Sequence, residues 1–215
     1  VSHASIHNFD EIDRLDVREG DTVDIKRAGD VIPQIISVDL DKRKKGSLKI
    51  SLPKRLPCCK KDLVKIEGEA ILRCTMGLDC PAQRIGSLIH FVSRNALNID
   101  GLGERIIELL VEKNLVSNFA DLFRLEIKDI IDLEGFGEKS ATNLIRSIQE
   151  SRETTLPRFI YSLGIREVGE ATAMNLAFNF NNITNFLSAN EEDFLEINDI
   201  GPVAANFIKE FLAID

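Results

Sequence analysis

The chain has 215 residues, of which 44% are hydrophobic and 29% charged, and its formal net charge is −8. This length fits one domain or two to three small ones, and the composition is typical of a globular protein. No apolar run approaches the roughly 18 residues that a membrane-spanning helix needs, and no signal-peptide pattern opens the chain. These observations argue against a membrane protein. The first residue is valine, which suggests a piece of a longer protein.

The negative charge lies in the C-terminal part of the chain. Residues 1–90 carry 16 Lys and Arg against 14 Asp and Glu, a net charge of +2, whereas residues 91–215 carry 11 against 21, a net charge of −10. An acidic segment of this size argues against a protein that binds an acidic partner through bulk positive charge.

Residues 1–53 are rich in strand formers. The segments "DTVDIKRAG", "VIPQIISVDL" and "SLKISL" predict about three strands, with a turn at Ala28-Gly29-Asp30 and a basic loop over 42–45. Three strands are too few to close a small barrel, so we expect these residues to be the end of a larger β domain.

Residues 54–85 contain all four cysteines of the chain, and "LVKIEGEAILRC" predicts a hairpin that turns at Gly68. Without secretory signals, such a cluster indicates metal binding in a reducing cytoplasm before it indicates disulfides. A structural zinc site takes four Cys or His ligands. The candidate ligands are Cys58, Cys59, Cys74 and Cys80.

The first pair of cysteines is irregular because Cys58 and Cys59 are adjacent. Side chains of neighbouring residues in a strand point to opposite sides, so both sulfurs reach one ion only if the backbone is kinked. Two interpretations remain open: zinc held by Cys59, Cys74 and Cys80 with a strained Cys58, or a site that has lost its metal and is held by packing.

From about residue 86 the pattern becomes helical, and one motif recurs. It appears as "GLGERIIELL", "GFGEKSATNLI", "EVGEATAMNL" and "DIGPVAANFI". The aligned glycines are Gly103, Gly137, Gly169 and Gly201, at intervals of 34, 32 and 32 residues. A fixed period of this size predicts a repeated helix–turn–helix unit.

Each aligned glycine is expected to begin a helix after a tight turn. Glycine permits a positive φ and a close approach of another group, and the first turn of a helix offers free N–H groups and the positive end of the dipole. These features make an anion site that needs no charged side chain. Ala141, Ala173 and Ala205 lie four residues after their glycines and predict close helix packing, whereas the first unit has Ile107 there.

This pattern resembles the helix-hairpin-helix motif, which holds DNA backbone phosphates without reading the base sequence. The resemblance implies that DNA is bound by the hairpin glycines and by nearby cations. These residues are Gly101, Gly103, Gly135, Gly137, Gly164, Gly169, Arg94, Arg105, Lys139, Arg146 and Arg166. Residues 184–215 carry seven acids and one lysine, so the fourth hairpin is expected to be mainly structural. The alternative is a helical packing module of the sterile-alpha-motif kind.

Longer segments resemble the C-terminal half of bacterial NAD-dependent DNA ligases. They are "VSHASIHNFDEI", "RAGDVIPQI", "EGEAILRC", "HFVSRNALNIDGLGERIIELLVEKNLV" and "LGIREVGEATA". The resemblance implies a multidomain α+β chain: the C-terminal part of an OB-fold (1–53), a zinc-finger-like unit (54–85) and four helix-hairpin-helix repeats (86–215). The family's zinc knuckle begins C-P-x-C; here Leu56 takes the first cysteine position and Cys59 the second, and Cys58 is extra.

The resemblance also implies an activity. These ligases use NAD and Mg²⁺ to adenylate a lysine, pass the AMP to the 5′ phosphate at a nick and seal it, in DNA replication and repair. The K-x-D-G tetrapeptide of that lysine does not occur in these residues, so the chain is expected to be inactive alone. It would form part of a clamp on nicked duplex DNA, as a monomer, with Arg27 and the basic loop facing the backbone. The alternatives are a stand-alone DNA-binding module of a repair protein and a helical protein-interaction scaffold.

Overall fold

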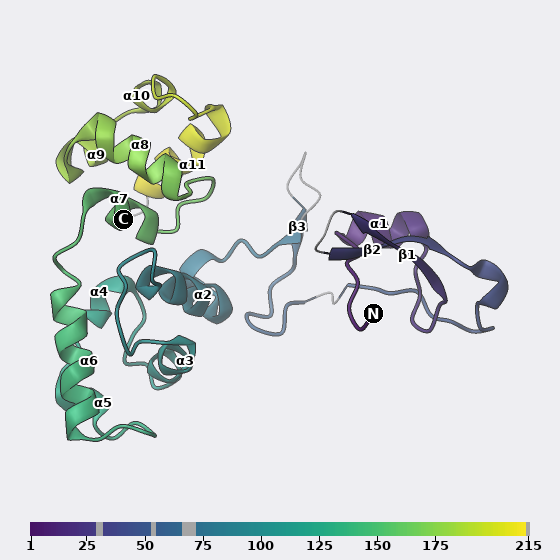
Figure 1. Ribbon diagram of the computed structural model, residues 1–215, viewed down its shortest axis with the longest axis horizontal. Coiled ribbons are helices and arrows are strands. Elements are labelled where there is room, and N and C mark those ends of the chain that lie inside the picture. Colours follow the sequence, from purple (N-terminus) through teal and green to yellow (C-terminus); the bar gives the residue numbers. More distant parts are fainter. Residues whose placement is uncertain (29–31, 53–54, 66–71, 214–215) are drawn as a thin grey trace. The chain divides into compact units, whose positions relative to one another are not determined.

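The computed structural model describes residues 1–28, 32–52, 55–65 and 72–213 (Figure 1). The chain divides into two compact units, Val1–Gly77 and Leu78–Asp215. Short strands lie in the first unit and most helices in the second, which confirms the predicted α+β class with an all-helical C-terminal part. Among the helices of these residues, none is both long and apolar enough to cross a bilayer.

The first unit contains a helix and a two-stranded hairpin. Helix α1 (Phe9–Leu15) begins at Asn8, whose side chain accepts a hydrogen bond from the Glu11 N–H at 2.9 Å. Strands β1 (Val23–Ala28) and β2 (Ile32–Val38) pair antiparallel, as predicted, and the short 3₁₀ helix η1 (Leu40–Lys42) follows. The turn predicted at Gly29 and Asp30 lies outside the described residues.

The third predicted strand does not form. Within "SLKISL" only Lys49 makes a strand-like contact, an isolated bridge to Arg18, and Leu48 is 81% exposed. The segment is rich in strand formers, but a strand also needs a partner along its length, and none of the described segments pairs with more than one residue of it.

The cysteine-bearing part of the first unit contains the predicted hairpin. Strands β3 (Val64–Lys65) and β4 (Leu72–Arg73) pair antiparallel. The turn predicted at Gly68 falls outside the described residues. The 3₁₀ helix η2 (Gly77–Asp79) follows.

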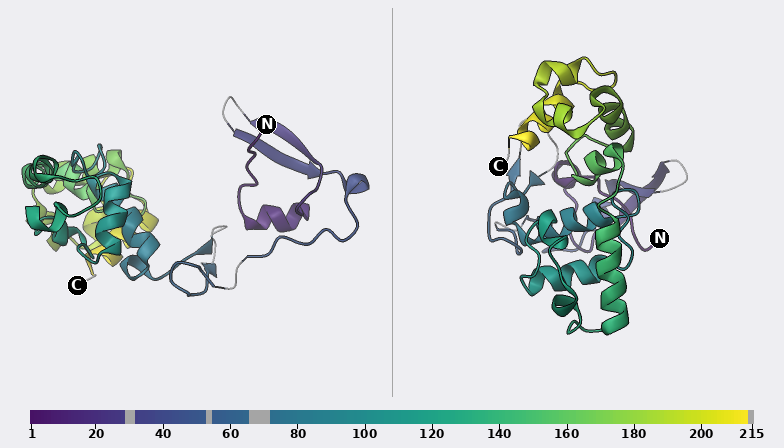
Figure 2. Two further views of the ribbon diagram at one scale, coloured as in Figure 1. Left: turned by 90° about the horizontal axis from the view of Figure 1, so that it is seen from below. Right: turned by 90° about the vertical axis from the view of Figure 1, so that its left-hand side faces the viewer.

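The second unit contains ten helices among its described residues, drawn from blue-green to yellow in Figure 2, and eight of them form four pairs. The pairs α2/α3, α5/α6, α7/α8 and α10/α11 each flank one of the repeated glycine motifs. The helices are α2 (Pro81–Val92), α3 (Glu104–Glu112), α4 (Phe119–Leu122), α5 (Ile127–Ile130), α6 (Glu138–Glu150), α7 (Leu156–Ser162), α8 (Glu170–Phe180), α9 (Ile183–Ser188), α10 (Glu191–Leu195) and α11 (Pro202–Leu212).

Two apolar clusters hold these helices together, one within residues 88–148 and one within 160–208. Ala141, Ala173 and Ala205 are completely buried in them, which confirms that the small residue four positions after each glycine lies at a helix contact. Ile107 occupies the corresponding position of the first hairpin and is equally buried. The packing around α3 therefore accommodates isoleucine at a position where the other hairpins have alanine.

Polar contacts join the two halves of the helical unit. Arg158 of α7 donates from Nε to the Ala96 carbonyl at 2.8 Å and from Nη2 to the Arg94 carbonyl at 2.6 Å. Beside it, His90 Nε2 lies 2.8 Å from the Tyr161 carbonyl oxygen. These bonds place α7, the first helix of the third hairpin, next to the end of α2 and the residues that follow it.

Candidate nucleic-acid interface

The four hairpins share one backbone conformation. The aligned glycines cap helices α3, α6, α8 and α11 and are all extended, with φ of −80°, −138°, −83° and −88°. The positive φ occurs instead two residues earlier, at Gly101 (83°), Gly135 (88°), Glu167 (63°) and Asp199 (68°). The positive φ expected at the capping glycines therefore occurs two positions earlier, and in two hairpins an acidic residue adopts it.

The capping glycines face open space and need no special φ. A Cβ atom added to any of the four would meet no described atom within 4 Å. The first turn of each following helix thus begins at an open surface. N–H groups at the start of a helix generally lack a partner inside it and can hold an anion; in α3 the Ile106 N–H instead donates to the Gly103 carbonyl at 3.0 Å.

Helices α6 and α11 differ in how many of these amides they offer. In α6 the Gly137 N–H donates to Ser140 Oγ at 2.9 Å, and the next two residues, Glu138 and Lys139, each carry an N–H. In α11 the first residue is Pro202, which has no N–H to donate. The fourth hairpin therefore combines fewer amides with acidic surroundings.

A groove of about 660 Å³ lies between the turn of the first hairpin and the second hairpin, including helix α6. It brings together four of the predicted site residues: Gly101, Arg105, Gly135 and Arg146. Arg105 Nη2 lies 3.3 Å from Glu134 Oε1, and Arg146 Nε lies 3.9 Å from Glu150 Oε1. All four of these charged side chains are at least 68% exposed, so the ion pairs are weak and the cations can turn toward a ligand.

The remaining predicted cations of this unit differ in their surroundings. Lys139 is exposed and makes no ion pair with another described residue. Arg166 lies over the ring of Phe207 at 4.2 Å, which orients its guanidinium. Arg94 contributes a backbone carbonyl to the contact with Arg158.

Gly164 has a packing role that its motif did not reveal. A Cβ at this position would lie 3.2 Å from Cδ2 of His90, and its φ is 65°. The third hairpin therefore approaches α2 closely at this point, and glycine permits that approach.

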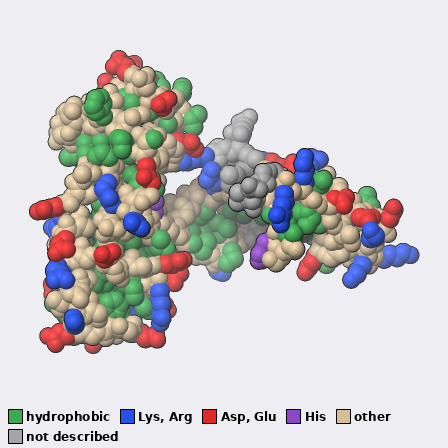
Figure 3. All heavy atoms as spheres, in the orientation of Figure 1, with side chains coloured by type: hydrophobic (Ala, Val, Ile, Leu, Met, Phe, Trp, Pro, Cys, Tyr) green, Lys and Arg blue, Asp and Glu red, His purple; other side chains and the backbone are tan. Residues whose placement is uncertain are grey.

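The helical unit has an interspersed rather than a uniformly basic surface. On the face drawn in Figure 3, acidic and basic side chains are interspersed over this unit. This distribution agrees with the net charge of residues 91–215 and leaves backbone amides as the main candidates for holding phosphates.

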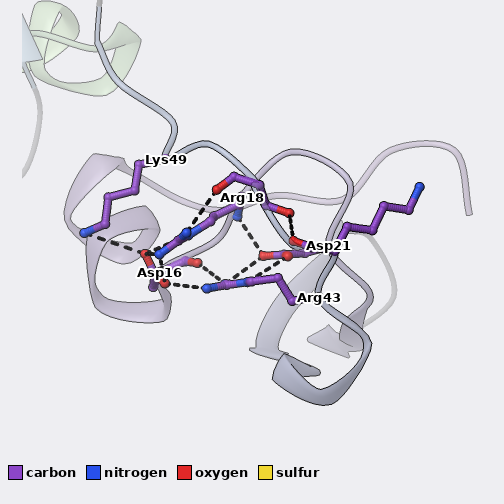
Figure 4. A network of polar contacts seen from close by, with 7 residues as sticks. Asp16, Arg18, Asp21, Arg43 and Lys49 are labelled. Atoms are coloured by element: carbon purple, nitrogen blue, oxygen red, sulfur yellow. Dashed lines mark hydrogen bonds and ion pairs between the residues drawn. The ribbon is translucent and has the colours of Figure 1, made fainter.

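In the first unit, Arg27 is exposed on β1. In the basic loop, by contrast, Arg43 forms ion pairs within the unit (Figure 4). Arg43 Nη1 lies 2.6 Å from Asp16 Oδ2, and its Nη2 lies 2.9 Å from Asp21 Oδ2. The hydrogen bond from Arg43, followed by that from Arg18, lowers the pKa of Asp16 to about 2. Since the Arg43 side chain is only 14% exposed, the expectation that the whole loop faces DNA is wrong for this residue.

The cysteines of the first unit lie close together. Cys59 Sγ is 3.9 Å from Cys58 Sγ and 3.7 Å from Cys74 Sγ. The backbone at residues 57–59 forms a turn rather than a strand, so the kink that two adjacent ligands require is present. Cys80 caps α2 and is buried.

Two polar residues of this surface, Ser140 and Asn95, were not predicted from the sequence. Ser140, three residues after Gly137, could have been found because a polar side chain at that helix position can accept a hydrogen bond from the N–H of the capping residue. Asn95 donates to Glu170 Oε1 at 2.7 Å, next to the third capping glycine. That contact joins residues 75 positions apart and has no local sequence signature.

Family models match successive parts of the chain. The NAD-dependent DNA ligase OB-fold domain matches residues 1–47, and the NAD-dependent DNA ligase C4 zinc finger domain matches residues 57–82. A SAM-like helix-hairpin-helix tandem matches residues 93–150, and a helix-hairpin-helix motif matches residues 158–215.

Curated relatives align with nearly the whole chain. A DNA ligase of Hahella chejuensis is 53% identical over 211 residues, which are 98% of this chain and 31% of the relative. DNA ligases of Saccharophagus degradans and Marinobacter nauticus are 48% and 51% identical, over 99% and 98% of this chain and 32% and 31% of theirs. The chain therefore spans about a third of the length of these relatives.

Proposed function

Since the chain belongs to the NAD-dependent DNA ligase family, we propose that it binds duplex DNA without sequence preference, as part of a clamp on nicked DNA. The whole protein would use NAD and Mg²⁺ to seal nicks in replication and repair. This segment would position the duplex and take no covalent part in the reaction. One copy suffices, as a monomer, because each copy carries several hairpins that act together on one duplex.

The repeated open helix start carries this proposal. At α3, α6 and α8 the space that a side chain of the capping glycine would take is open, and a cation is close in the sequence in each case: Arg105, Lys139 and Arg166. Phosphates are suited to such a site because the amides and the helix dipole favour negative charge. This arrangement binds the backbone and reads no base, so it is independent of sequence.

The first two hairpins supply the best-defined part of the interface. The groove between them is lined by Gly101 and Gly135 with Arg105 and Arg146, so two turn glycines and two cations share one surface. Gly164 and Gly169 belong to the third hairpin, Arg94 lies beside it where its carbonyl accepts from Arg158, and Arg27 would add a contact from the first unit. The fourth hairpin contributes mainly to the fold, because Pro202 removes an amide and acids surround it.

The cysteine cluster fits zinc, and the matched C4 zinc finger domain includes all four cysteines. We propose that Cys59, Cys74 and Cys80, with Cys58, hold one structural zinc ion. When bound, the ion would cross-link segments that have few apolar contacts of their own, so metal binding and local folding would be coupled.

The test of DNA binding uses fluorescence anisotropy with labelled nicked, intact and single-stranded oligonucleotides of two unrelated sequences. We expect binding to both duplexes, equal for the two sequences and weaker for the single strands. Equal affinity for all strands, or strong preference for one sequence, would contradict a backbone-binding clamp. A helical protein-interaction scaffold would bind none of these probes.

A further inference from the structure

The zinc site proposed above has an unusual feature in this chain, the adjacent pair Cys58 and Cys59. We infer that both residues are zinc ligands, so that the metal is held by a vicinal cysteine pair and the side chain of Leu56 takes no part. The inference rests on the proposed zinc site and specifies its ligands.

The number of available sulfurs supports this assignment. The matched domain is a C4 zinc finger, and the chain contains four cysteines in all, each within the matched residues. A site with four thiolate ligands therefore requires Cys58. Residue 56 is leucine and has no ligand atom.

The sulfur positions in the first unit support it independently. Four sulfurs at about 2.3 Å from a tetrahedral zinc ion lie about 3.8 Å from one another. The Sγ atoms of Cys58 and Cys59 are 3.9 Å apart, and those of Cys59 and Cys74 are 3.7 Å apart. Both separations match an edge of such a tetrahedron.

The backbone explains how two adjacent side chains reach one ion. The Lys60 N–H donates to the Leu56 carbonyl at 2.8 Å, and the Leu56 N–H donates to the Lys61 carbonyl at 2.8 Å. These bonds close a loop around the two cysteines, and Lys60 adopts a φ of 58°. In a turn of this kind, neighbouring side chains are not forced to opposite sides as they are in a strand.

The experiment compares the full 215-residue chain with three variants. Cys58→Ser removes the sulfur, Cys58→His replaces it by another zinc ligand, and Leu56→Ala alters the same turn without removing a sulfur. Zinc content is measured by elemental analysis, and zinc affinity by competition with a chromophoric chelator. Cobalt substitution then reports the number of thiolates through its sulfur-to-metal charge-transfer absorption.

We expect about one zinc per chain in the unmodified protein. Cys58→Ser should weaken zinc binding by at least about tenfold, since even lost outer-shell contacts cost 10- to 100-fold, and lower the cobalt charge-transfer band by about a quarter. Cys58→His should retain zinc with the same reduced band, and Leu56→Ala should change neither quantity. The rescue by histidine separates ligation from a structural effect of the substitution.

Two results would overturn the inference in distinguishable ways. If the unmodified chain binds no zinc, the zinc site itself fails together with this ligand set. If the unmodified chain and Cys58→Ser bind zinc with equal affinity and give the same cobalt spectrum, only the vicinal pair fails, and another group completes the site.

Discussion

Gly135 and Asp199 occupy the same position in their hairpins, two residues before the capping glycine, and both have a positive φ, of 88° and 68°. This conformation is costly for most residues with a side chain, by roughly 1–2 kcal/mol, whereas glycine adopts it freely and aspartate tolerates it. The second hairpin thus uses glycine where the fourth uses an aspartate.

Gly135→Ala should therefore lower the free energy of unfolding of the helical unit by about 1–2 kcal/mol. Gly86→Ala is the matched control, because Gly86 lies inside α2 and an added Cβ meets no described atom within 4 Å. That substitution should raise stability by about 0.5–1 kcal/mol, the usual helix gain of alanine over glycine. Thermal and denaturant unfolding followed by circular dichroism measures both changes, and equal effects of one sign would refute the positive-φ argument.

The hairpins could be predicted from the sequence because their determinants are local. A glycine, a hydrophobic neighbour and an alanine four residues later specify the turn and the helix contact, as at Gly137 and Ala141. The contacts of Arg158 with Ala96 and Arg94 could not be predicted in this way, because they join residues more than 60 positions apart.

The candidate site shows the same division between local and distant determinants. The motif spacing predicted which glycines begin helices, but it did not show that Arg105 and Arg146 share a groove, since the fold brings them together. In the basic loop, charge alone did not distinguish Arg43, which binds Asp16 and Asp21, from the exposed Lys44.

The Arg43 network predicts a pH dependence for the first unit. Arg43→Met should destabilise this unit at neutral pH because Asp16 and Asp21 lose their partner. The network lowers the pKa of both carboxyl groups, that of Asp16 from 3.8 to about 2. Its contribution is therefore complete above about pH 4 and disappears as the pH falls toward 2.

Amide hydrogen exchange of β1 and β2 at pH 7 and at pH 2.5, corrected for the intrinsic rates, measures the effect. The difference in protection between Arg43→Met and the unmodified chain should be large at pH 7 and much smaller at pH 2.5. A difference that is independent of pH would show that Arg43 acts through packing alone.

Removal of zinc should affect the cysteine segment more than the helical unit. The described residues of β3 and β4 form only a short pair, and both Val64 and Lys65 are exposed, so the metal would provide much of the local stability. After chelation, amide protection should be lost around residues 55–65 and 72–77 and restored by added zinc. If less than about a tenth of an equivalent of zinc is present and the chelator changes nothing, the metal-free alternative is correct.

DNA binding should weaken with salt to a moderate degree. Each phosphate that is neutralised contributes about −0.9 to the slope of log affinity against log salt concentration. Three active hairpins with few cations predict roughly three to five phosphates, and hence a slope of about −3 to −5. Anisotropy titrations over a range of salt concentrations give this slope; a value near zero would contradict phosphate contacts.

The final prediction concerns the capping glycine of the second hairpin. Gly137→Val should weaken DNA binding by about 1–2 kcal/mol, or roughly 5- to 30-fold, because lost hydrogen bonds to a charged group cost about this much. Backbone strain plays no part, since φ at Gly137 is −138° and valine adopts such a conformation readily. Its side chain would instead occupy the open space at the start of α6, where we expect a phosphate to approach.

Two variants serve as comparisons for Gly137→Val. Lys139→Ala removes one exposed cation and should lower DNA affinity by about 1 kcal/mol or less.

Gly201→Val makes the same change at the fourth capping glycine, which is equally open and extended. Both valines should therefore lower stability by a similar amount, about 1 kcal/mol, because valine is a poorer helix cap. Gly201→Val should nevertheless leave DNA affinity almost unchanged, because that hairpin is rich in acidic residues and Pro202 has no N–H.

Anisotropy on a nicked duplex, with melting curves for each variant, decides between the outcomes. Equal losses for the two valines at equal stability would refute the ranking of the hairpins, and a loss only for Lys139→Ala would refute phosphate binding by the backbone amides.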